Sequence, residues 1–270
     1  MTLPLVMGVV NVTPDSFSDG GRFFDPGAAL AHARQLIAEG ANILDIGGES
    51  TRPGAEPVDE AEEISRVVPL IGALAGQARI SIDTLKPAVA RAAIAAGASI
   101  WNDVTALGAP GALETAAELG CEVMLMHMQG EPRTMQAAPR YDDVVAEVSA
   151  FLDARARAAL AAGVARERIW LDPGIGFGKT PEHNLALLRH LDRIAELGFP
   201  VVLGVSRKRF IQAIDPTATD AADRRGGSLA GALWGAAHGT AAVRVHDVRE
   251  TVQALKVWAA INTVGGEPRV

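Results

Sequence analysis

Cysteine is almost absent from the sequence, since Cys121 is the single thiol in 270 residues. One cysteine cannot form an internal disulfide, and it excludes a cysteine-rich metal cluster. Such sparse use of cysteine is typical of proteins from a reducing compartment. We therefore expect a cytoplasmic protein.

Long apolar runs are also absent. The N-terminal stretch LPLVMGVV, residues 3–10, follows no basic region, precedes no cleavage-site pattern and is too short to cross a bilayer. Positive charge is scarcer than negative charge, with 25 Lys and Arg against 32 Asp and Glu and a net charge of −7. This balance argues against general nucleic-acid binding but permits a local cationic pocket for a small anion. We expect neither a membrane nor a nucleic acid as a partner.

No segment is rich in Pro or Ser, and no block of like charges indicates a linker between domains. A chain of this length can bury a substantial core as one large α/β domain. We predict a single domain over residues 1–270.

Three common catalytic motifs fail where their chemistry requires a particular residue. In DPGIGFGKT, residues 172–180, a phosphate-binding Walker loop would need glycine where Pro173 stands, and proline has a fixed φ and no N–H. In GVSRK, residues 204–208, a nucleophile elbow at Ser206 would need glycine where Lys208 stands. No two histidines flank a Glu at the spacing of a zinc-protease helix, and His127 is expected to be a buried structural histidine. A zinc enzyme is therefore not expected.

What recurs along the chain is a short β-branched run followed by an alanine-rich helical pattern. The runs lie at residues 5–11, 42–48, 79–84, 99–104, 122–128, 168–174, 201–206 and 241–247. They are short and almost continuously apolar, as expected of parallel strands covered on both faces. The helical patterns include residues 26–39, ended by Gly40, and residues 142–162, ended by Gly163. Eight such units in about 250 residues predict an α/β fold of the (β/α)8 TIM barrel type, with an active site at the C-terminal ends of the strands.

A polar or charged residue stands at or just beyond nearly every predicted strand end. The set consists of Asn11, residues 47–52, Asp83, Asn102 and Asp103, His127, Asp172, Ser206 and Lys208, and Arg244 and His246. Strand ends are solvated in any barrel, but a surface without function would favour Gly, Ser and Thr over Asp, Asn, Lys, Arg and His. We interpret this ring as a binding site.

The ring offers two complementary chemistries. Asp83, Asn102 and Asp172 present carboxylates and an amide, which suit a heterocycle with several N–H donors and one carbonyl. The cationic donors could hold a phosphate or a carboxylate; they are Arg52, Lys208, Arg244 and His246. For any one of the carboxylates, a buried salt bridge to a neighbouring cation is an equally open interpretation.

Residues 172–180 are interpreted as a loop that lies close to a ligand. Asp172 ends the sixth strand, the glycines would let the backbone approach a ligand without Cβ clashes, and Phe177 could lie against a flat ring. Thr180 is expected to cap the next helix, with Pro181 at its first position.

Together these residues resemble the dihydropteroate synthase family of the folate pathway. The similar stretches are MGVVNVTPDSFSDGG (7–21), DIGGESTRPGA (45–55), SIDT (81–84), NDV (102–104), MHMQGEPRTMQ (126–136), DPGIGFGKT (172–180), GVSRK (204–208) and RVHDV (244–248). One stretch alone is a weak signal, whereas eight in order along nearly the whole chain are specific. The departures are Leu85, Val205 and Arg209, where serine, threonine and a small residue are frequent in the family. None removes a ligand group, although the extra cation of Arg209 could change how a benzoate carboxylate is held.

The resemblance implies an enzyme that joins 6-hydroxymethyl-7,8-dihydropterin diphosphate to 4-aminobenzoate and releases diphosphate with the help of Mg²⁺. The implied pterin-binding residues are Asp83, Asn102, Met126, Asp172, Phe177, Gly204, Lys208 and Arg244. The implied diphosphate-binding residues are Asn11, Arg52, Arg244 and His246, with Asn11 also a metal ligand. The implied aminobenzoate-binding residues are Phe17, Thr51, Arg52, Pro53, Ser206 and Lys208. Asp83, Asp172, Lys208 and Arg244 are the implied catalytic residues, and the family also implies a homodimer.

The residues permit an SN1-like substitution. Mg²⁺, Arg244, His246 and Asn11 would stabilise the charge of the leaving diphosphate, and Asp83 and Asp172 would compensate the positive charge that develops on the reduced pterin. The amine of 4-aminobenzoate is neutral at pH 7 and needs no strong base, which agrees with the absence of a nucleophile–base pair. Loops at residues 13–25 and 47–57 are implied to close over the substrates and exclude water.

Two other functions stay open. A pterin-binding methyltransferase, which passes a methyl group from a folate to a corrinoid partner, would not need Arg52, Arg244 and His246 to hold diphosphate. A non-catalytic pterin-binding paralogue would be expected to lack loop residues such as Arg52 or Phe17, and both are present. The last helical pattern, residues 251–264, has an apolar stripe that could complete the barrel shell or form part of a dimer surface.

Overall fold

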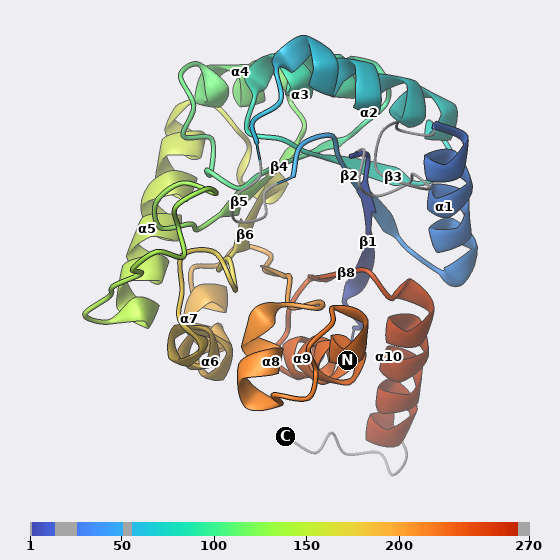
Figure 1. The fold of residues 1–270 in the computed structure, drawn as a ribbon. Helices are drawn as coiled ribbons and strands as arrows, with labels where there is room; N and C mark the ends of the chain where they lie inside the picture. Colours follow the sequence, from blue (N-terminus) through green and yellow to red (C-terminus); the bar gives the residue numbers. More distant parts are fainter. Residues whose placement is uncertain (1, 14–25, 51–55, 264–270) are drawn as a thin grey trace.

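Eight parallel strands form one sheet within residues 2–13, 26–50 and 56–263, the part of the chain that the computed structural model describes. The strands are β1 (Leu5–Asn11), β2 (Ile43–Gly47), β3 (Arg79–Asp83), β4 (Ile100–Asp103), β5 (Glu122–Met126), β6 (Ile169–Asp172), β7 (Val202–Leu203) and β8 (Ala242–Val245). Their order is β6-β5-β4-β3-β2-β1-β8-β7, and a bridge between Leu171 and Val201 joins the two outer strands. The sheet therefore closes into a barrel, as the sequence predicts (Figure 1).

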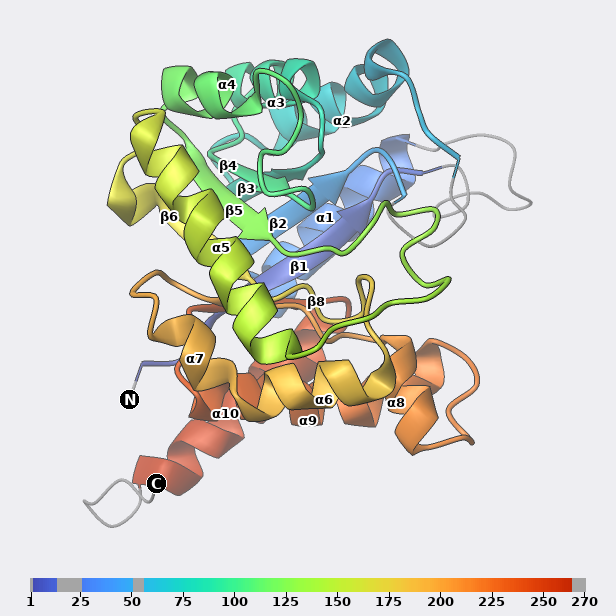
Figure 2. The ribbon, with the colours of Figure 1, turned by 90° about the vertical axis from the view of Figure 1, so that its left-hand side faces the viewer.

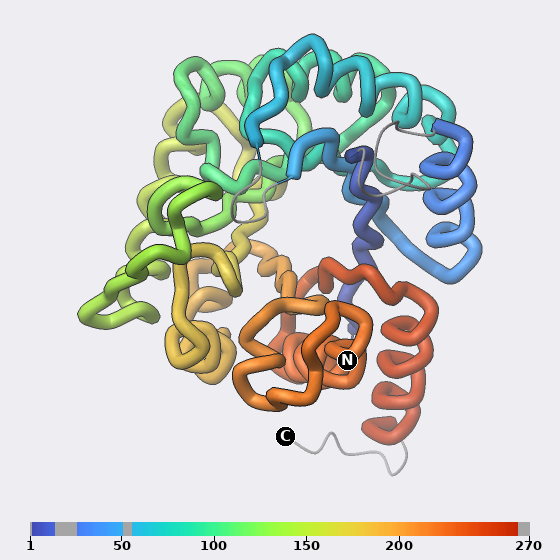
Figure 3. Tube along the Cα trace, viewed as in Figure 1, coloured from blue at the N-terminus to red at the C-terminus, as the bar shows by residue number. Residues whose placement is uncertain are grey.

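Helices cover the outer face of this barrel and follow the strands around the ring in chain order (Figures 1 and 3). They are α1 (Pro26–Glu39), α2 (Glu60–Leu74), α3 (Pro87–Ala95), α4 (Ala112–Leu119), α5 (Val144–Ala161), α6 (Pro181–Arg189), α7 (Leu191–Ala195), α8 (Arg209–Ile214), α9 (Arg225–Ala237) and α10 (Val248–Thr263), with short 3₁₀ turns at Arg166–Arg168 and Ala222–Arg224. None of the helices within the described ranges is long and apolar enough to cross a membrane.

Several helix ends lie where the sequence places them. Helix α1 spans the predicted residues and is followed by Gly40, whose φ of 105° favours glycine. Thr180 caps α6 by accepting a hydrogen bond from the His183 N–H, and Pro181 is its first residue. Helix α5 begins two residues later than predicted, because the Asp143 side chain caps it by accepting from the next free N–H groups.

Two apolar layers hold the barrel together. The larger one fills the space between strands and helices and includes Leu36, Ile46, Ile82 and Leu171. The smaller one lies inside the barrel and consists of Met7, Ile43, Ile100, Met124, Trp170, Val202 and Ala242. Each fully buried side chain of this size contributes about 1.5–3 kcal/mol by leaving water. Because the strands supply apolar side chains on both faces, the barrel is a packed core, and its active site is expected at the C-terminal ends of the strands.

Strand β7 is shorter than predicted. The sequence favours a strand over residues 201–206, but only two residues pair with β8. Beyond them the chain turns away from the ladder, with Arg207 at a φ of 58° and its N–H donated to Ser228 Oγ on α9 over 2.8 Å. This turn takes residues 204–208 out of the sheet and leaves β6 and β7 joined by a single bridge.

Candidate active site

Arg244 lies at the centre of a buried charge cluster inside the barrel. From β8, its Nε donates to Asp45 Oδ2 on β2 over 2.6 Å, and its Nη2 donates to Asp83 Oδ2 on β3 over 2.7 Å. Asn102 on β4 donates from Nδ2 to the same Asp45 Oδ2 over 3.2 Å. Four strands thus send side chains to one point. The salt-bridge interpretation, which the sequence left open, is confirmed for Asp83.

Asp45 belongs to this cluster, although no motif in the sequence singles it out by itself. It is fully buried in the middle of β2, in the stretch ILDIG. A charged side chain in a short buried strand needs a buried partner. This requirement could have identified Asp45 from the sequence.

The charges of the cluster do not balance, because one guanidinium faces two carboxylates. Burial raises the pKa of Asp83 well above its ordinary value; Arg244 opposes this rise, whereas Asp45 adds to it. Burial also opposes the charge on Arg244, but the two carboxylates outweigh it and raise the pKa of Arg244. Asp83 Oδ1 is buried and has no hydrogen-bond partner among the described residues. An acceptor is therefore left for a donor from a ligand.

Asp172 and Lys208 form the other side of the site, at the joint between β6 and β7. Burial raises the pKa of Asp172, and the positive charge of Lys208 opposes this rise. Burial lowers the pKa of Lys208 to about 8, and the negative charge of Asp172 opposes this fall. Gly204 lies between the two cations: a Cβ at this position would be 3.7 Å from Lys208 Nζ and 3.8 Å from Arg244 Cβ. Glycine there keeps the space between them open.

The loop after β6, residues 174–178, turns its carbonyl groups toward side-chain donors. Lys179 Nζ donates to the carbonyls of Gly174 and Phe177, and Lys208 Nζ donates to that of Ile175. The Gly176 carbonyl accepts from Gln136 Nε2 over 2.6 Å, and the Gly178 carbonyl accepts from the Tyr141 hydroxyl over 2.8 Å. A phosphate-binding loop presents N–H groups to an anion. This loop has the opposite polarity, so the rejection of a Walker loop is supported by its geometry.

Two glycines of this loop leave room for the backbone of the loop after β5. A Cβ on Gly174 would lie 1.8 Å from the His127 carbonyl oxygen, and one on Gly178 would lie 2.5 Å from the Gln129 carbonyl oxygen. Two of the glycines also face predicted site residues: the Cβ position of Gly176 is 3.1 Å from Lys208 Cδ, and that of Gly174 is 3.3 Å from Met126 Cγ. Gly174 and Gly178 are therefore needed for the loop after β5 to pack closely, and the expectation that the glycines let the backbone approach a ligand stays a prediction.

Lys179 is a second buried residue that the sequence does not reveal. Its side chain is 3% exposed, and its Nζ lies 2.9 Å from His127 Nδ1. Burial lowers the pKa of Lys179 to about 7, with a further contribution from Lys208. Burial also lowers the pKa of His127 to about 3, so this histidine is neutral. His127 is thus the buried structural histidine that the sequence predicts.

Ser206 and His246 meet at the ends of β7 and β8. Ser206 Oγ accepts from the His246 N–H over 3.2 Å and lies 3.0 Å from His246 Nδ1. Between Ser206 and Lys208, the Arg207 side chain forms two hydrogen bonds with Asp247, at 3.0 and 2.6 Å. The Arg207–Asp247 ion pair therefore stabilises the turn that places Ser206 and Lys208 on opposite sides of Arg207.

The remaining predicted site residues fall into two groups. Asn11 is half-buried at the end of β1, and Met126 is buried at the end of β5, where it pairs in register with Asp172. Phe177 is half-buried, with its ring centre 4.8 Å from Lys208 Nζ. Four predicted residues lie outside the described residues: Phe17, Thr51, Arg52 and Pro53.

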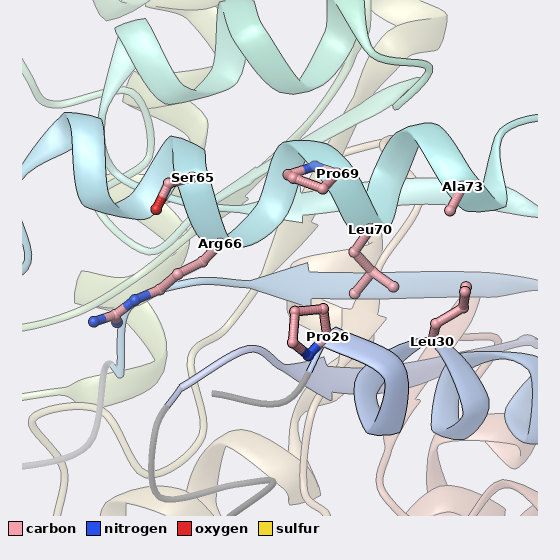
Figure 4. Close-up of a pocket in the computed structure, with 7 residues that line it drawn as sticks. All are labelled: Pro26, Leu30, Ser65, Arg66, Pro69, Leu70 and Ala73. Carbon is pink, nitrogen blue, oxygen red and sulfur yellow. The ribbon is translucent and has the colours of Figure 1, made fainter. Parts of the chain in front are cut away.

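Asp103 and a pocket on the outer side of the barrel do not belong to the site. Asp103 ends β4, but its carboxylate accepts from the N–H groups of Thr105 and Leu107 and so shapes its own loop. A pocket between α1 and α2 is lined by Pro26, Leu30, Ser65, Arg66, Pro69, Leu70 and Ala73 (Figure 4). Its lining is mostly apolar and offers no group of acids and bases, so the strand ends remain the candidate active site.

The chain is similar to known proteins along nearly its whole length. Residues 7–246 match the family described as pterin binding enzyme. The chain is 51% identical over 263 residues to the dihydropteroate synthase of Neisseria meningitidis serogroup C, and the alignment covers 96% of this chain and 93% of that protein. The structure of Xanthomonas albilineans dihydropteroate synthase with 4-aminobenzoic acid has a TM-score of 0.91 at 52% identity, covering 97% of this chain and 94% of that one. The structure of the same enzyme with 7,8-dihydropteroate has a TM-score of 0.87 at 48% identity, covering 98% and 96%.

Proposed function

Because the chain belongs to the pterin binding enzyme family, among the dihydropteroate synthases, we propose that the mouth of its barrel makes 7,8-dihydropteroate. The enzyme is a transferase that condenses 6-hydroxymethyl-7,8-dihydropterin diphosphate with 4-aminobenzoate in folate biosynthesis and releases diphosphate. The observation that carries this function is the cluster of Arg244, Asp83 and Asn102 facing Asp172 and Lys208 at the strand ends.

The pterin ring is proposed to bind between these two groups. Asp83 Oδ1, buried without a partner among the described residues, would accept from a pterin N–H. Asp172 and Asn102 would form hydrogen bonds with other polar groups on the edge of the pterin ring, and Lys208 would donate to the pterin carbonyl. Met126, Phe177 and Gly204 would line the space, with Phe177 already beside Lys208.

The diphosphate is proposed to lie against Arg244, His246 and Asn11. Arg244 uses Nε and Nη2 to bind the carboxylates, and no hydrogen bond from its Nη1 is seen among the described residues. This nitrogen could donate to an oxygen of the leaving group as negative charge develops on it. Arg52 is proposed to add a further donor, but it lies outside the described residues.

Mg²⁺ is proposed as the cofactor. No group of three or more His, Cys, Asp or Glu within residues 2–13, 26–50 and 56–263 could hold a metal by itself. Magnesium is usually bound through one or two protein oxygens together with substrate phosphates and water, and the Asn11 side-chain oxygen fits such a role. When bound, the ion would neutralise charge on the diphosphate.

The second substrate is proposed to approach past Ser206 and Lys208, with Phe17, Thr51, Arg52 and Pro53 forming the rest of its wall. Its amine is neutral at pH 7 and attacks the exocyclic carbon after the C–O bond has begun to break. Asp83 and Asp172 stabilise the positive charge that the reduced pterin carries at that stage. Arg209, the first residue of α8, is exposed, and an effect on the benzoate carboxylate stays a prediction.

Purified protein supplied with the pterin diphosphate, 4-aminobenzoate and Mg²⁺ tests this function. We expect dihydropteroate and diphosphate to form only when both substrates are present. Pterin binding without product would overturn the synthase function and favour a binding paralogue or a methyltransferase.

The pH profile of the enzyme is expected to depend on Lys208. Burial holds its pKa near 8 in the folded protein, below the ordinary value for lysine, so its charge is lost as pH rises through about 8. Since kcat/KM reports ionisations of the free enzyme, kcat/KM for the pterin diphosphate should fall above this pH. Lys208→Arg keeps the charge, so its alkaline limb should move to higher pH. The exposed Lys256→Arg serves as the control, and an unmoved limb in Lys208→Arg would remove Lys208 as the titrating group.

A homodimer is proposed as the assembly. Helix α10 packs against α9, α1 and β1 and so completes the barrel shell, but Val257 and Ile261 on it are 55% and 68% exposed. With Trp258 and Leu233 they line an apolar groove between α9 and α10 that a second copy could cover. Light scattering should give the mass of a dimer for the wild type and of a monomer for the double variant Val257→Glu, Ile261→Glu. The neighbouring Lys256→Glu lies outside the groove and should remain dimeric; a double variant that stays dimeric would place the interface elsewhere.

A cytoplasmic location is also proposed. It is supported by the sparse use of cysteine: the single thiol, Cys121, is buried, and burial raises its pKa to about 11, which makes it unreactive.

A further inference from the structure

Lys179 has an environment that the proposed reaction does not explain. Lysine is rarely buried without a charged partner, yet all four groups that contact Lys179 Nζ are neutral. They are the carbonyls of Gly174, Phe177 and His127, at 2.9, 3.0 and 3.3 Å, and His127 Nδ1, at 2.9 Å. Burying a lysine in this way is unfavourable, so a compensating role is expected at this position.

The four contacts join two different loops. His127 directly follows β5, whereas Gly174 and Phe177 belong to the loop between β6 and α6. Strands β5 and β6 pair in register up to Asp172, and the His127 N–H donates to the Asp172 carbonyl over 3.0 Å. Lys179 continues the connection beyond the last backbone pair. Figure 2 shows the loop after β5 and the loop after β6 emerging at the same end of the barrel.

The contacts also reach the pterin side of the site. Gly174 donates its N–H to Asp172 Oδ1 over 2.7 Å, while its carbonyl accepts from Lys179. Phe177, whose carbonyl also accepts from Lys179, has its ring beside Lys208 Nζ. Lys179 Nζ thus binds the backbone of Gly174, which orients the Asp172 carboxylate. It also binds the backbone of Phe177, whose ring lies beside Lys208.

The connection does not require one protonation state. A protonated Lys179 can donate to both loop carbonyls and to the Nδ1 lone pair of the neutral His127. A neutral Lys179 can donate to the two carbonyls and accept a hydrogen bond from the His127 Nδ1–H, if the other tautomer is present. The groups that face Lys179 are His127 on the β5 side, Asp172 on β6 and Lys208 before α8.

We infer that Lys179 is a positioning residue for pterin binding: by joining the loops after β5 and β6, its side chain holds Asp172 and Phe177 in their binding geometry. This inference rests on the proposed pterin site. It gives the Gly-Lys-Thr sequence a function other than phosphate binding.

The test compares Lys179→Met with Tyr141→Phe. The first keeps an apolar side chain of similar length but removes all four contacts of Nζ. The second removes one hydrogen bond to the same loop, at the Gly178 carbonyl, and leaves all four Lys179 contacts to Gly174, Phe177 and His127 in place. Binding of 6-hydroxymethylpterin is measured by calorimetry, and steady-state constants are measured for both substrates, well below the melting temperature of each variant.

We expect Lys179→Met to raise the Kd of the pterin, and to lower kcat/KM for the pterin diphosphate, at least tenfold, while KM for 4-aminobenzoate changes less than twofold. Tyr141→Phe should change the pterin Kd less than twofold. Unchanged pterin affinity in a folded Lys179→Met, or an equal loss for both substrates, would overturn the inference.

If Lys179→Met does not fold, Lys179→Gln takes its place, because its amide retains two N–H donors. An intermediate pterin affinity is then expected, and wild-type affinity would count against the role. The calorimetric comparison needs no turnover, so it decides the role of Lys179 even where the wild type binds pterin without making dihydropteroate, an outcome that would overturn the proposed function alone.

Discussion

Replacing Arg244 by Met should abolish measurable turnover and also lower the free energy of unfolding, by about 3–5 kcal/mol, because breaking a buried ion pair leaves uncompensated charge. Both Asp45 and Asp83 depend on this guanidinium, and Asp45 is fully buried. The diphosphate would lose its cationic partner in the same variant. Unfolding in urea followed by circular dichroism measures the first effect, and dihydropteroate formation measures the second.

The stability loss of Arg244→Met should shrink as the pH falls. Removing the cation raises the pKa of Asp83 further, so protonation of Asp83 at acidic pH removes its repulsion with Asp45. The matched control is Arg249→Met on α10, an exposed arginine for which no loss is expected. A folded Arg244→Met variant as stable as the wild type at neutral pH would show that the two carboxylates do not need the guanidinium.

Replacing Asp83 by Asn is expected to lower kcat about 10²–10³-fold, as is typical when one group that stabilises transition-state charge is removed. The amide oxygen can still accept from Arg244 Nη2, so the fold should be kept, and the charge balance of the cluster with Asp45 should improve. The loss therefore lies in the missing negative charge opposite the developing pterin cation, and it should appear in kcat more than in KM.

Rapid-quench measurement of the first turnover separates this chemical step from product release. The control is Asp192→Asn, an exposed carboxylate on α7. Turnover within a few-fold of wild type in Asp83→Asn would remove the cation-stabilising role of Asp83.

Much of the fold could be predicted because βα repeats place one strand end after another at the same end of the barrel. Asp83 and Asn102 are opposite each other in the ladder, and so are Met126 and Asp172, as expected for residues at equivalent strand ends. The pattern of short apolar runs and alanine-rich helices carries this information directly. The C-terminal ends of these strands could therefore be predicted as the candidate site before any contact was known.

The residues that the sequence did not reveal are those defined by three-dimensional contacts. Asp45 lies two residues before its strand ends, and its importance comes from Arg244, 199 residues later in the chain. Lys179 resembled the lysine of a phosphate loop, and its partner His127 is 52 residues away. The requirement for glycine at Gly174 comes from the His127 carbonyl. No local pattern records such distant partners.

The short strand β7 has a consequence for how substrate and barrel affect each other. Between β6 and β7 there is a single backbone bridge, and at the mouth this seam is supplemented by Lys208, which donates to the Ile175 carbonyl and attracts Asp172 across the joint. The side chains proposed to bind the pterin, Asp172 and Lys208, therefore also help to close the barrel between β6 and β7. A bound pterin would span the seam, and amide hydrogen exchange in residues 171–176 and 201–204 should then become slower. Bound substrate would therefore stabilise the barrel between β6 and β7, where a single backbone bridge connects the strands.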